Sequence, residues 1–154
     1  MTPPLRLRPV PLAVILPLRH AVLRPGRPLA TAHFDGDEDA DTVHLAAVLD
    51  GSDEVVGCAT LMRRPHGGEP AWQLRGMATR ADHARRGVGT AVLRAAEALA
   101  RARGGPTLLW CNARLAAVPF YASAGWRVVS DAFDIPGIGP HHLMVRRVEV
   151  ECGA

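Results

Sequence analysis

The chain has 154 residues, 48% of them hydrophobic and 21% charged, which is the composition of one globular domain with a single core. All 18 basic residues are arginine, so no lysine is present for a catalytic imine or a P-loop. The net charge of +3 is scattered and only 5% of residues are aromatic, which argues against a nucleic-acid-binding surface. We expect one domain over residues 1–154.

The three cysteines indicate a reducing compartment. Cys58 and Cys111 fall in apolar, strand-like runs, and with Cys152 they make an odd number, which predicts buried thiols rather than a disulfide framework. The longest apolar run, residues 9–18, is too short to span a bilayer, and no small-residue cleavage pattern follows it. We therefore expect a cytoplasmic protein without a membrane segment.

The first forty residues predict a strand, a helix and an acidic loop. Residues 5–10 alternate apolar and basic side chains, as in an edge strand that tolerates proline. Residues 11–23 carry apolar side chains at helical spacing, and Pro17 could interrupt that helix. Residues 24–41 predict a loop that ends before the next strand.

Five acidic residues of that loop lie between positions 35 and 41. Their alternation suggests a calcium loop, but the glycine and glutamate that an EF-hand needs at its sixth and twelfth positions are replaced by Ala40 and Ala46. We therefore expect no metal. The acidic run is interpreted as a solvated loop, or as one lying over a cationic surface of a substrate site.

Three strands are expected next. Residues 42–50 and 54–61 are strand-like runs joined by Gly51, Ser52 and Asp53, a good hairpin turn. A third run covers residues 71–78. Together they predict an antiparallel meander.

A glycine-rich loop then opens a long helix in residues 79–103. Apolar residues follow at steps of three and four: Val88, Ala91, Val92, Ala95, Ala96, Leu99 and Ala102. The first amides of a helix lack intrahelical partners and lie at the positive end of its dipole. Gly87 and Gly89 let an anion approach those amides, and Arg85 and Arg86 add positive charge. The pattern predicts a phosphate site.

The remaining segment predicts a buried strand at residues 107–111, a helix at 114–124 and strands at 126–129 and 143–148. Residues 134–142 are expected to form a loop. The order is β-α-β-β-β-α-β-α-β-β, so the expected fold is α+β, a three-layer arrangement of about seven mostly antiparallel strands flanked by helices.

Two common phosphate-binding motifs fail here. The P-loop needs a lysine after its glycines, and a dinucleotide fold needs a third glycine where Val92 stands. The segment from Ala84 to Gly89 instead resembles the acetyl-CoA loop of the GNAT superfamily of N-acetyltransferases, Gln/Arg-x-x-Gly-x-Gly/Ala. Ala84 departs from the first position of that pattern.

A second signature supports the resemblance. Residues 112–126 are similar to the family segment N-x-x-x-x-A-x-x-F/L-Y-x-x-x-G-F. The matching positions are Asn112, Ala117, Phe120, Tyr121, Gly125 and Trp126. Residues 137–144 resemble the Gly-Ile-Pro-His ending of the ElaA-like branch, with one extra glycine.

The resemblance implies how acetyl-CoA would be held. Backbone groups of the strand before the loop would bind the pantetheine arm and polarise the thioester carbonyl; by position these belong to Met77, Ala78 and Thr79. The pyrophosphate would lie on the loop residues Arg85, Arg86, Gly87, Val88, Gly89 and Thr90. Asn112 would contact the cofactor or the substrate amide, or would cap the following helix.

The resemblance also implies catalytic roles. Tyr121, the chain's one tyrosine, occupies the position of the general acid that protonates the CoA thiolate. No glutamate precedes the loop, where Gln73 and Arg75 stand instead. Among His44, His83, His141 and His142 we select His141 as the base, with an ordered water chain as the alternative.

The expected activity is acetyl transfer from acetyl-CoA to a primary amine of a small molecule or peptide, by direct attack in a ternary complex. No cysteine has the setting of a nucleophile. The alternative is a non-catalytic CoA-binding regulatory module. Arg24 and Arg75 hint at an anionic group on the acceptor, with a solvated surface role as the alternative for each. Neither a nucleic acid nor a membrane is expected as a partner, and a homodimer is left open.

Overall fold

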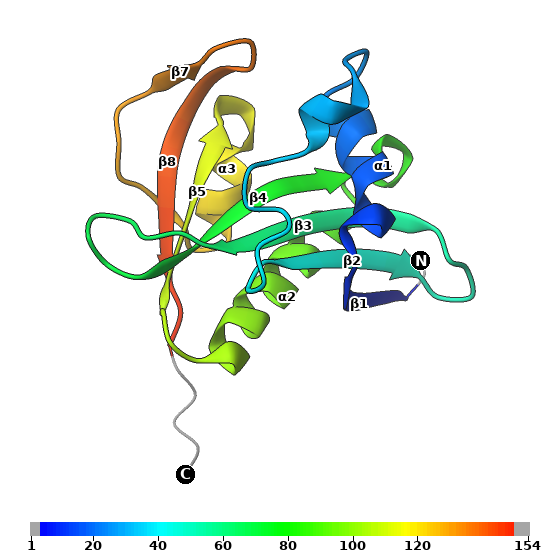
Figure 1. The fold of residues 1–154 in the computed structure, drawn as a ribbon, viewed down its shortest axis with the longest axis horizontal. Helices are drawn as coiled ribbons and strands as arrows, with labels where there is room; N and C mark the ends of the chain where they lie inside the picture. Colours follow the sequence, from blue (N-terminus) through cyan, green and yellow to red (C-terminus); the bar gives the residue numbers. More distant parts are fainter. Residues whose placement is uncertain (1–3, 150–154) are drawn as a thin grey trace. The chain divides into compact units, whose positions relative to one another are not determined.

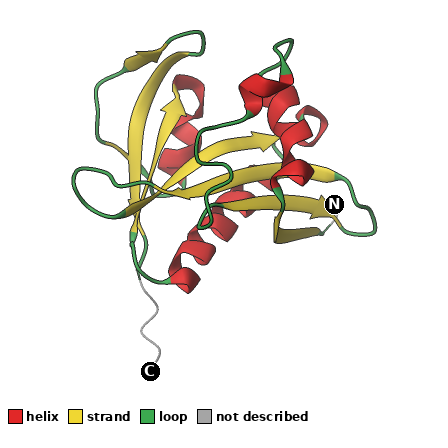
Figure 2. Ribbon diagram, in the orientation of Figure 1, coloured by secondary structure: helices red, strands yellow, loops and turns green. Residues whose placement is uncertain are grey.

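The structure of the protein is a computed structural model, which describes residues 4–149 (Figures 1 and 2). The chain divides into two compact units. Unit 1 comprises the residues up to Met62 together with Leu74–Leu99, and unit 2 comprises Arg63–Gln73 together with the residues from Ala100 onward. Within the described part of the chain, eight strands follow the hydrogen-bonded order β1-β2-β3-β4-β5-β8-β6, with β7 paired to β8.

Unit 1 is built from the N-terminal strands and the two longer helices. Its elements are β1 (Leu5–Val10), α1 (Leu12–Leu23), the 3-10 turn η1 (Leu29–Ala32), β2 (Val43–Leu49), β3 (Val55–Arg63), most of β4 (Ala71–Thr79), the 3-10 turn η2 (Ala81–His83) and most of α2 (Val88–Arg103). β1 pairs antiparallel with β2, and β2 pairs antiparallel with β3.

The helices of unit 1 cover opposite faces of these strands, as Figure 1 shows for α1 in front and α2 behind. Successive residues of a strand point to opposite faces. Ala46 packs in a cluster with Ile15 and Leu18 of α1, whereas Ala47 lies on the face where Gly57 meets α2. Unit 1 is therefore a three-layer sandwich of helix, sheet and helix.

Unit 2 holds the start of β4 and the C-terminal strands. Its elements are β5 (Leu108–Arg114), the 3-10 turn η3 (Leu115–Ala117), α3 (Val118–Ser123), β6 (Arg127–Val128), β7 (Phe133–Ile135) and β8 (Gly139–Arg147). β5 pairs in parallel with residues 71–73 of β4 and antiparallel with β8 along seven residues. Ala71, Leu108 and Val145 form its buried cluster.

The expected α+β fold with a mixed, mostly antiparallel sheet is confirmed, with eight strands rather than about seven. The additional strand is β7. Residues 134–142 were expected to form a loop, and this was wrong: β7 and β8 form a hairpin in which Phe133 pairs with His141. Its turn at residues 136–138 is closed by a hydrogen bond from the Ile138 amide to the Ile135 carbonyl.

One boundary also differs from expectation. The helix expected from residue 114 begins at Val118, because Arg114 is still paired with His141 in the β5–β8 ladder. Helix α1 runs through Pro17 without ending. A proline in a helix interior removes one hydrogen bond, but Ile15 and Leu18 on either side are buried against β2, and this packing keeps the helix intact.

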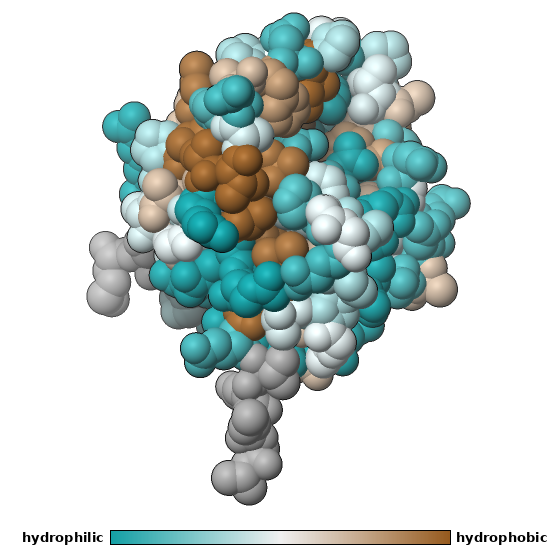
Figure 3. Space-filling view, turned by 90° about the vertical axis from the view of Figure 1, so that its left-hand side faces the viewer, coloured by the Kyte–Doolittle hydropathy of each residue, from teal (hydrophilic) through white to brown (hydrophobic). Residues whose placement is uncertain are grey.

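Unit 2 exposes apolar side chains beside β8. Figure 3, which views the molecule from the side of β7 and β8, shows a group of apolar residues on that face. Val128 and Val129 next to β8 are 42% and 43% exposed. The edge strand β6 has only two residues, which limits pairing with another sheet.

Two further properties concern only residues 4–149. Their helices are too short or too polar to cross a bilayer. No three histidine, cysteine, aspartate or glutamate side chains among them are grouped as a metal site would require. Cys152 lies outside the described residues.

Candidate active site

The predicted phosphate loop lies in unit 1, between the end of β4 and the start of α2. The turn η2 follows Thr79, and a tight turn over residues 84–87 leads into α2 at Val88. Arg85 and Gly87 both have left-handed backbone, with φ of 62° and 82°. A non-glycine residue in this region is uncommon and often marks a functional site. Arg85, Arg86 and Gly87 are exposed, so an anion can reach this backbone.

The first turn of α2 is anchored by Val88, which is 1% exposed. A Cβ built on Gly57 of β3 would lie only 2.6 Å from Cγ1 of Val88 and 3.1 Å from Cγ2 of Val92. The helix therefore packs directly on the backbone of β3. The Ala91 amide donates to the Gly87 carbonyl at 3.0 Å, so the amides of residues 88–90 precede this bond and face the helix start. Packing at Gly57 thus fixes where those amides lie.

Arg80, which follows β4 and precedes η2, is held by contacts of its backbone and its side chain. Its backbone amide donates to the Val56 carbonyl at 2.8 Å, and its guanidinium pairs with Glu54 and, at 2.7 Å, with Asp82. Hydrogen bonds from Arg80 and His83 hold the pKa of Asp82 below its usual range. The one carboxylate of η2 is therefore paired with the Arg80 guanidinium and bonded to His83.

The strand before the loop is kinked at Gly76. This residue has φ of 63° within β4, a conformation that L side chains rarely adopt. The Gly76 carbonyl accepts a weak bond from the Cys58 thiol at 3.6 Å. The residues after the kink, Met77, Ala78 and Thr79, are those expected to face the thioester and pantetheine arm.

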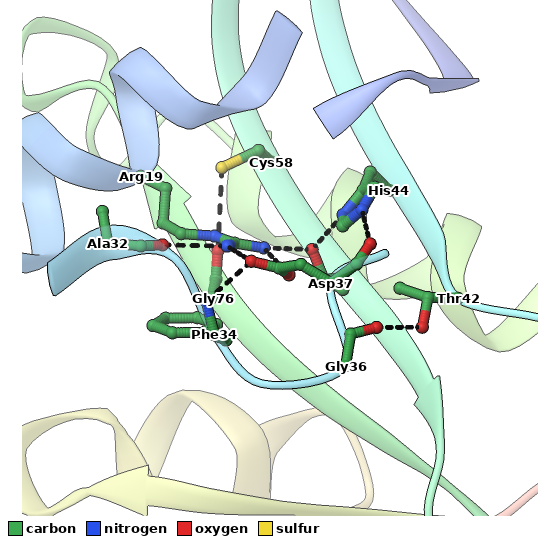
Figure 4. A network of polar contacts seen from close by, with 10 residues as sticks. Arg19, Ala32, Phe34, Gly36, Asp37, Thr42, His44, Cys58 and Gly76 are labelled. Atoms are coloured by element: carbon green, nitrogen blue, oxygen red, sulfur yellow. Dashed lines mark hydrogen bonds and ion pairs between the residues drawn. The ribbon is translucent and has the colours of Figure 1, made fainter. Parts of the chain in front are cut away.

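A buried ionic network lies beside this kink (Figure 4). The Arg19 guanidinium, 0% exposed, donates to both carboxylate oxygens of Asp37, at 2.7 and 3.1 Å, and to Thr60 Oγ1 at 2.6 Å. The expectation that the whole acidic run is a solvated loop was therefore wrong at Asp37, which is 5% exposed. Asp35, Glu38, Asp39 and Asp41 are exposed, as expected.

Tyr121, the predicted acid, lies in unit 2 on α3. It is buried, with its ring against Trp126 at 5.5 Å and against Phe120 at 5.2 Å between centroids. The Trp126 amide donates to the Tyr121 carbonyl at 3.0 Å, a bond that closes the helix at the left-handed Gly125. Burial, and to a smaller degree Cys111, raise the pKa of the phenol, so Tyr121 keeps its proton at neutral pH.

His141, the predicted base, lies in unit 2 on β8 and is 3% exposed. Its Nδ1 is 2.7 Å from the Gly139 carbonyl, and its ring stacks on Phe133 with centroids 6.0 Å apart. Because a carbonyl oxygen can only accept, Nδ1 carries the hydrogen. In the neutral ring Nε2 then has the lone pair that a base requires.

The other three candidate histidines also make local contacts. His44 has both ring nitrogens bonded, Nδ1 to Thr60 Oγ1 at 2.8 Å and Nε2 to the Asp37 carbonyl at 2.9 Å. His83 pairs with Asp82, and Nδ1 of His142 donates to the Ser130 carbonyl. These contacts leave His44 without a free ring nitrogen, whereas the bonds of His83, His141 and His142 lie at Nδ1.

Asn112 has an exposed side chain at the middle of β5, opposite Leu143 of β8. The alternative role considered for it, capping the following helix, was wrong. The N-cap positions of η3 and α3 are Arg114 and Ala117, and neither makes a side-chain cap bond. Asn112 is thus available for a ligand contact.

Arg24 and Arg75 share one feature in unit 1: both guanidinium groups lie over the ring of Phe34, at 5.6 and 4.4 Å from its centroid. Arg19 lies over the same ring at 4.2 Å. Three cations therefore surround this aromatic side chain. Sequence patterns did not single out Phe34.

Comparison with known proteins places the chain in a class. The model of the Acetyltransferase (GNAT) family matches residues 17–126. An uncharacterized N-acetyltransferase of Bacillus subtilis strain 168, YitI, is 32% identical over 130 residues, which cover 84% of this chain and 87% of YitI.

Solved structures show the same fold. Escherichia coli ElaA superposes with a TM-score of 0.79 at 18% identity, covering 94% of this chain and 100% of ElaA. An acyl-CoA N-acyltransferase from Pseudomonas aeruginosa superposes with a TM-score of 0.74 at 20% identity, covering 93% and 99% of the two chains.

The fold and the helix-start loop, together with these matches, define an acyltransferase. The chain belongs to the GNAT family of acetyltransferases, which confirms the resemblance seen in its two sequence signatures.

Sequence reasoning missed three structural participants: Arg19, Asp37 and Gly76. One signal could have found Arg19. It lies four residues after Ile15 and next to Leu18, on the apolar face of its helix, where a charged residue needs a buried partner.

Proposed function

We propose that this protein transfers the acetyl group of acetyl-CoA to a primary amine of a small molecule or peptide, by direct attack in a ternary complex. The observation that carries the proposal is the exposed left-handed turn at Arg85 and Gly87, which opens α2 after the turn η2 that follows the kinked strand β4. The family match spans segments of both units, which supports treating residues 1–154 as one acetyltransferase domain.

The loop suits the pyrophosphate of coenzyme A. The amides at the start of α2 and the positive end of the helix dipole attract an anion, and the exposed Arg85 and Arg86 add charge-assisted donors. Gly87 has no side chain to keep the phosphate away, and apart from its chain neighbours no atom lies within 4 Å of the position its Cβ would take. Gly89 and Thr90 belong to the same first turn, and the proposal gives Asn112 a polar contact with the cofactor or acceptor.

Acetyl-CoA supplies the activated acetyl thioester. The backbone of Met77, Ala78 and Thr79 is proposed to orient it, with the Met77 amide donating to the oxygen that becomes negative as the amine attacks. One such donor typically lowers the barrier by about 3 kcal/mol. Tyr121 retains its proton because burial raises its pKa, and it is proposed to give this proton to the departing sulfur. Nε2 of His141 is proposed to take the proton that the amine loses.

Direct transfer is supported by the state of the cysteines. Burial raises the pKa of both Cys58 and Cys111 to about 12, so at neutral pH both are thiols rather than thiolates. A thiol is a poor nucleophile, which argues against an acyl-cysteine intermediate. Their free, buried state also fits the proposed cytoplasmic location.

The proposal is tested by following free thiol release from acetyl-CoA with a panel of amines, and CoA binding by calorimetry. We expect Tyr121→Phe to lower kcat by about 10²-fold, the usual size of a general-acid contribution, while the Kd for CoA changes less than threefold. Ser123→Ala, an exposed change in the same helix, is the control and should match wild type.

Two results would contradict this reading. CoA that raises the melting temperature without thiol release with any amine would instead identify a non-catalytic CoA-binding module. If CoA does not raise the melting temperature at all, both the acetyltransferase and the CoA-binding module are contradicted.

A further inference from the structure

The kink at Gly76 is held from outside its own strand. Its φ of 63° lies in the left-handed region, and a Cβ built there would be 2.8 Å from Nε of Arg19 and 3.1 Å from Cε2 of Phe34. The backbone of β4 is thus in direct contact with a buried guanidinium and a phenyl ring. Because the Met77 amide follows this kink, the direction of its N–H depends on the conformation of Gly76.

The guanidinium that contacts Gly76 is fixed by its bonds to several segments. Arg19 comes from α1 and donates to the Ala32 carbonyl of η1 at 3.0 Å, besides its bonds to Asp37 and to Thr60 of β3. Asp37 Oδ2 also accepts from the Phe34 amide at 2.7 Å, which holds the second group that touches Gly76. One carboxylate therefore positions both neighbours of the kink.

The network continues to β2 without a conflict of donors and acceptors (Figure 4). Since the Asp37 carbonyl can only accept, Nε2 of His44 carries a hydrogen, and Nδ1 of the neutral ring accepts from the Thr60 hydroxyl. Thr60 Oγ1 in turn accepts from Arg19. Each of these four residues thus limits the movement of the others.

A buried ion pair is a poor way to gain stability alone, because desolvation offsets most of the attraction. Apolar residues of similar size would fill the same space. The pair does fix the orientation of the guanidinium whose Nε lies against Gly76, since a bidentate guanidinium has only one orientation on its carboxylate. The geometry therefore points to a role in position rather than in stability.

We propose that Arg19 and Asp37 are positioning residues for acetyl transfer: their buried pair holds the left-handed kink at Gly76 and so aims the Met77 amide at the thioester oxygen. This proposal rests on the proposed function, in which that amide is the oxyanion donor. It predicts that breaking the pair lowers kcat more than it weakens cofactor binding, because the pyrophosphate loop lies beyond the kink on α2.

The experiment compares Asp37→Asn with Ile15→Ala, a buried apolar change in the same helix as Arg19 that removes no polar contact of the network. Both variants should lower the melting temperature. We expect Asp37→Asn to lower kcat at least tenfold with the Kd for CoA within threefold, and Ile15→Ala to keep kcat within twofold of wild type. Equal kcat values in the two variants would overturn the proposal.

Thr60→Val provides a second variant if Asp37→Asn fails to fold, because it keeps the shape of Thr60 and removes only the hydroxyl that accepts from Arg19. It should also lower kcat, by about three- to tenfold. A kcat within twofold of the Ile15→Ala value would count against the proposal.

Backbone NMR separates this proposal from the proposed function. A non-hydrolysable thioether analogue of acetyl-CoA should shift the Met77 amide resonance in wild type, and the shift should be smaller in Asp37→Asn. The shift can be smaller in Asp37→Asn than in wild type even if no amine is acetylated. That result would support the positioning proposal and contradict the proposed catalysis. If the analogue shifts the Met77 amide resonance in Asp37→Asn as much as in wild type, the positioning proposal is refuted and the proposed function is not affected.

Discussion

Gly57→Ala tests whether the cofactor loop is placed by packing of α2 on β3. The new methyl group would start 2.6 Å from Cγ1 of Val88 and 3.1 Å from Cγ2 of Val92. Carbon atoms pack best at about 3.5–4.0 Å, so the first turn of α2 must retreat by about 1 Å. Val88 and Val92 are each 1% exposed, which leaves them no space to rotate into solvent.

The expected cost follows from two opposing effects. Overpacking a core costs about 1–3 kcal/mol, whereas replacing glycine by alanine restricts the unfolded chain and returns about 0.4–1 kcal/mol. We expect Gly57→Ala to lower the free energy of unfolding by about 1–2 kcal/mol. A displacement of about 1 Å can lower a reaction rate by a factor of about 10². We expect the same displacement of the CoA-binding amides to raise the Kd for CoA at least tenfold.

A double-mutant cycle isolates the contact. Val88→Ala removes two methyl groups, worth about 1.6 kcal/mol at about 0.8 kcal/mol each, and leaves a space that the methyl group introduced by Gly57→Ala can enter. Urea denaturation followed by circular dichroism should therefore show the double variant at least about 1 kcal/mol more stable than the sum of the single changes predicts. Additive changes, or a Gly57→Ala variant as stable as wild type with unchanged CoA affinity, would refute the packing described here.

Three further predictions follow from the site. In a Cys152→Ser background, Cys58 and Cys111 should not react with Ellman's reagent at pH 8, because a pKa of about 12 leaves them neutral, and both should react after unfolding in guanidinium. Gly87→Ala places a side chain at φ of 82° where glycine stood, so by calorimetry we expect CoA to bind at least tenfold more weakly while the melting temperature falls by a few degrees. Because Arg75, the residue before the kink in β4, lies over Phe34, we expect amines carrying a carboxylate or phosphate to have lower KM than their neutral analogues, and Arg75→Gln to abolish the difference.

The loop and the order of elements were predictable because their signals are local. Gly87 and Gly89 stand immediately before an apolar repeat, and Gly104 with Gly105 follows it, so both ends of α2 are marked in the sequence. The buried side of α2 was predicted less well. Leu93 and Glu97 are fully buried, whereas Ala102 is exposed. Alanine occurs on every side of this helix and says little about which side faces the strands.

The hairpin of β7 and β8 was missed for a different reason. Its first strand has only three residues, too few for an alternation to be recognised, and Pro136 with Gly137 favoured a loop. What defines β7 is its pairing with residues 139–141, which no pattern within residues 133–135 contains. Asp37 was misjudged similarly, since its partner lies eighteen residues away in α1.

Gly57 and Gly76 allow cofactor binding and turnover to be separated. A side chain at Gly57 would meet α2, and one at Gly76 would meet Arg19 and Phe34 on the α1 side. Gly57→Ala moves the helix start and should raise the Kd for CoA, while kcat at saturating acetyl-CoA returns to within threefold of wild type. Gly76→Ala disturbs the strand that carries Met77, so it should lower kcat at least tenfold and leave the Kd for CoA within threefold. If both variants change binding and turnover together, the loop and the kink are not independent, and the separate roles assigned to them are wrong.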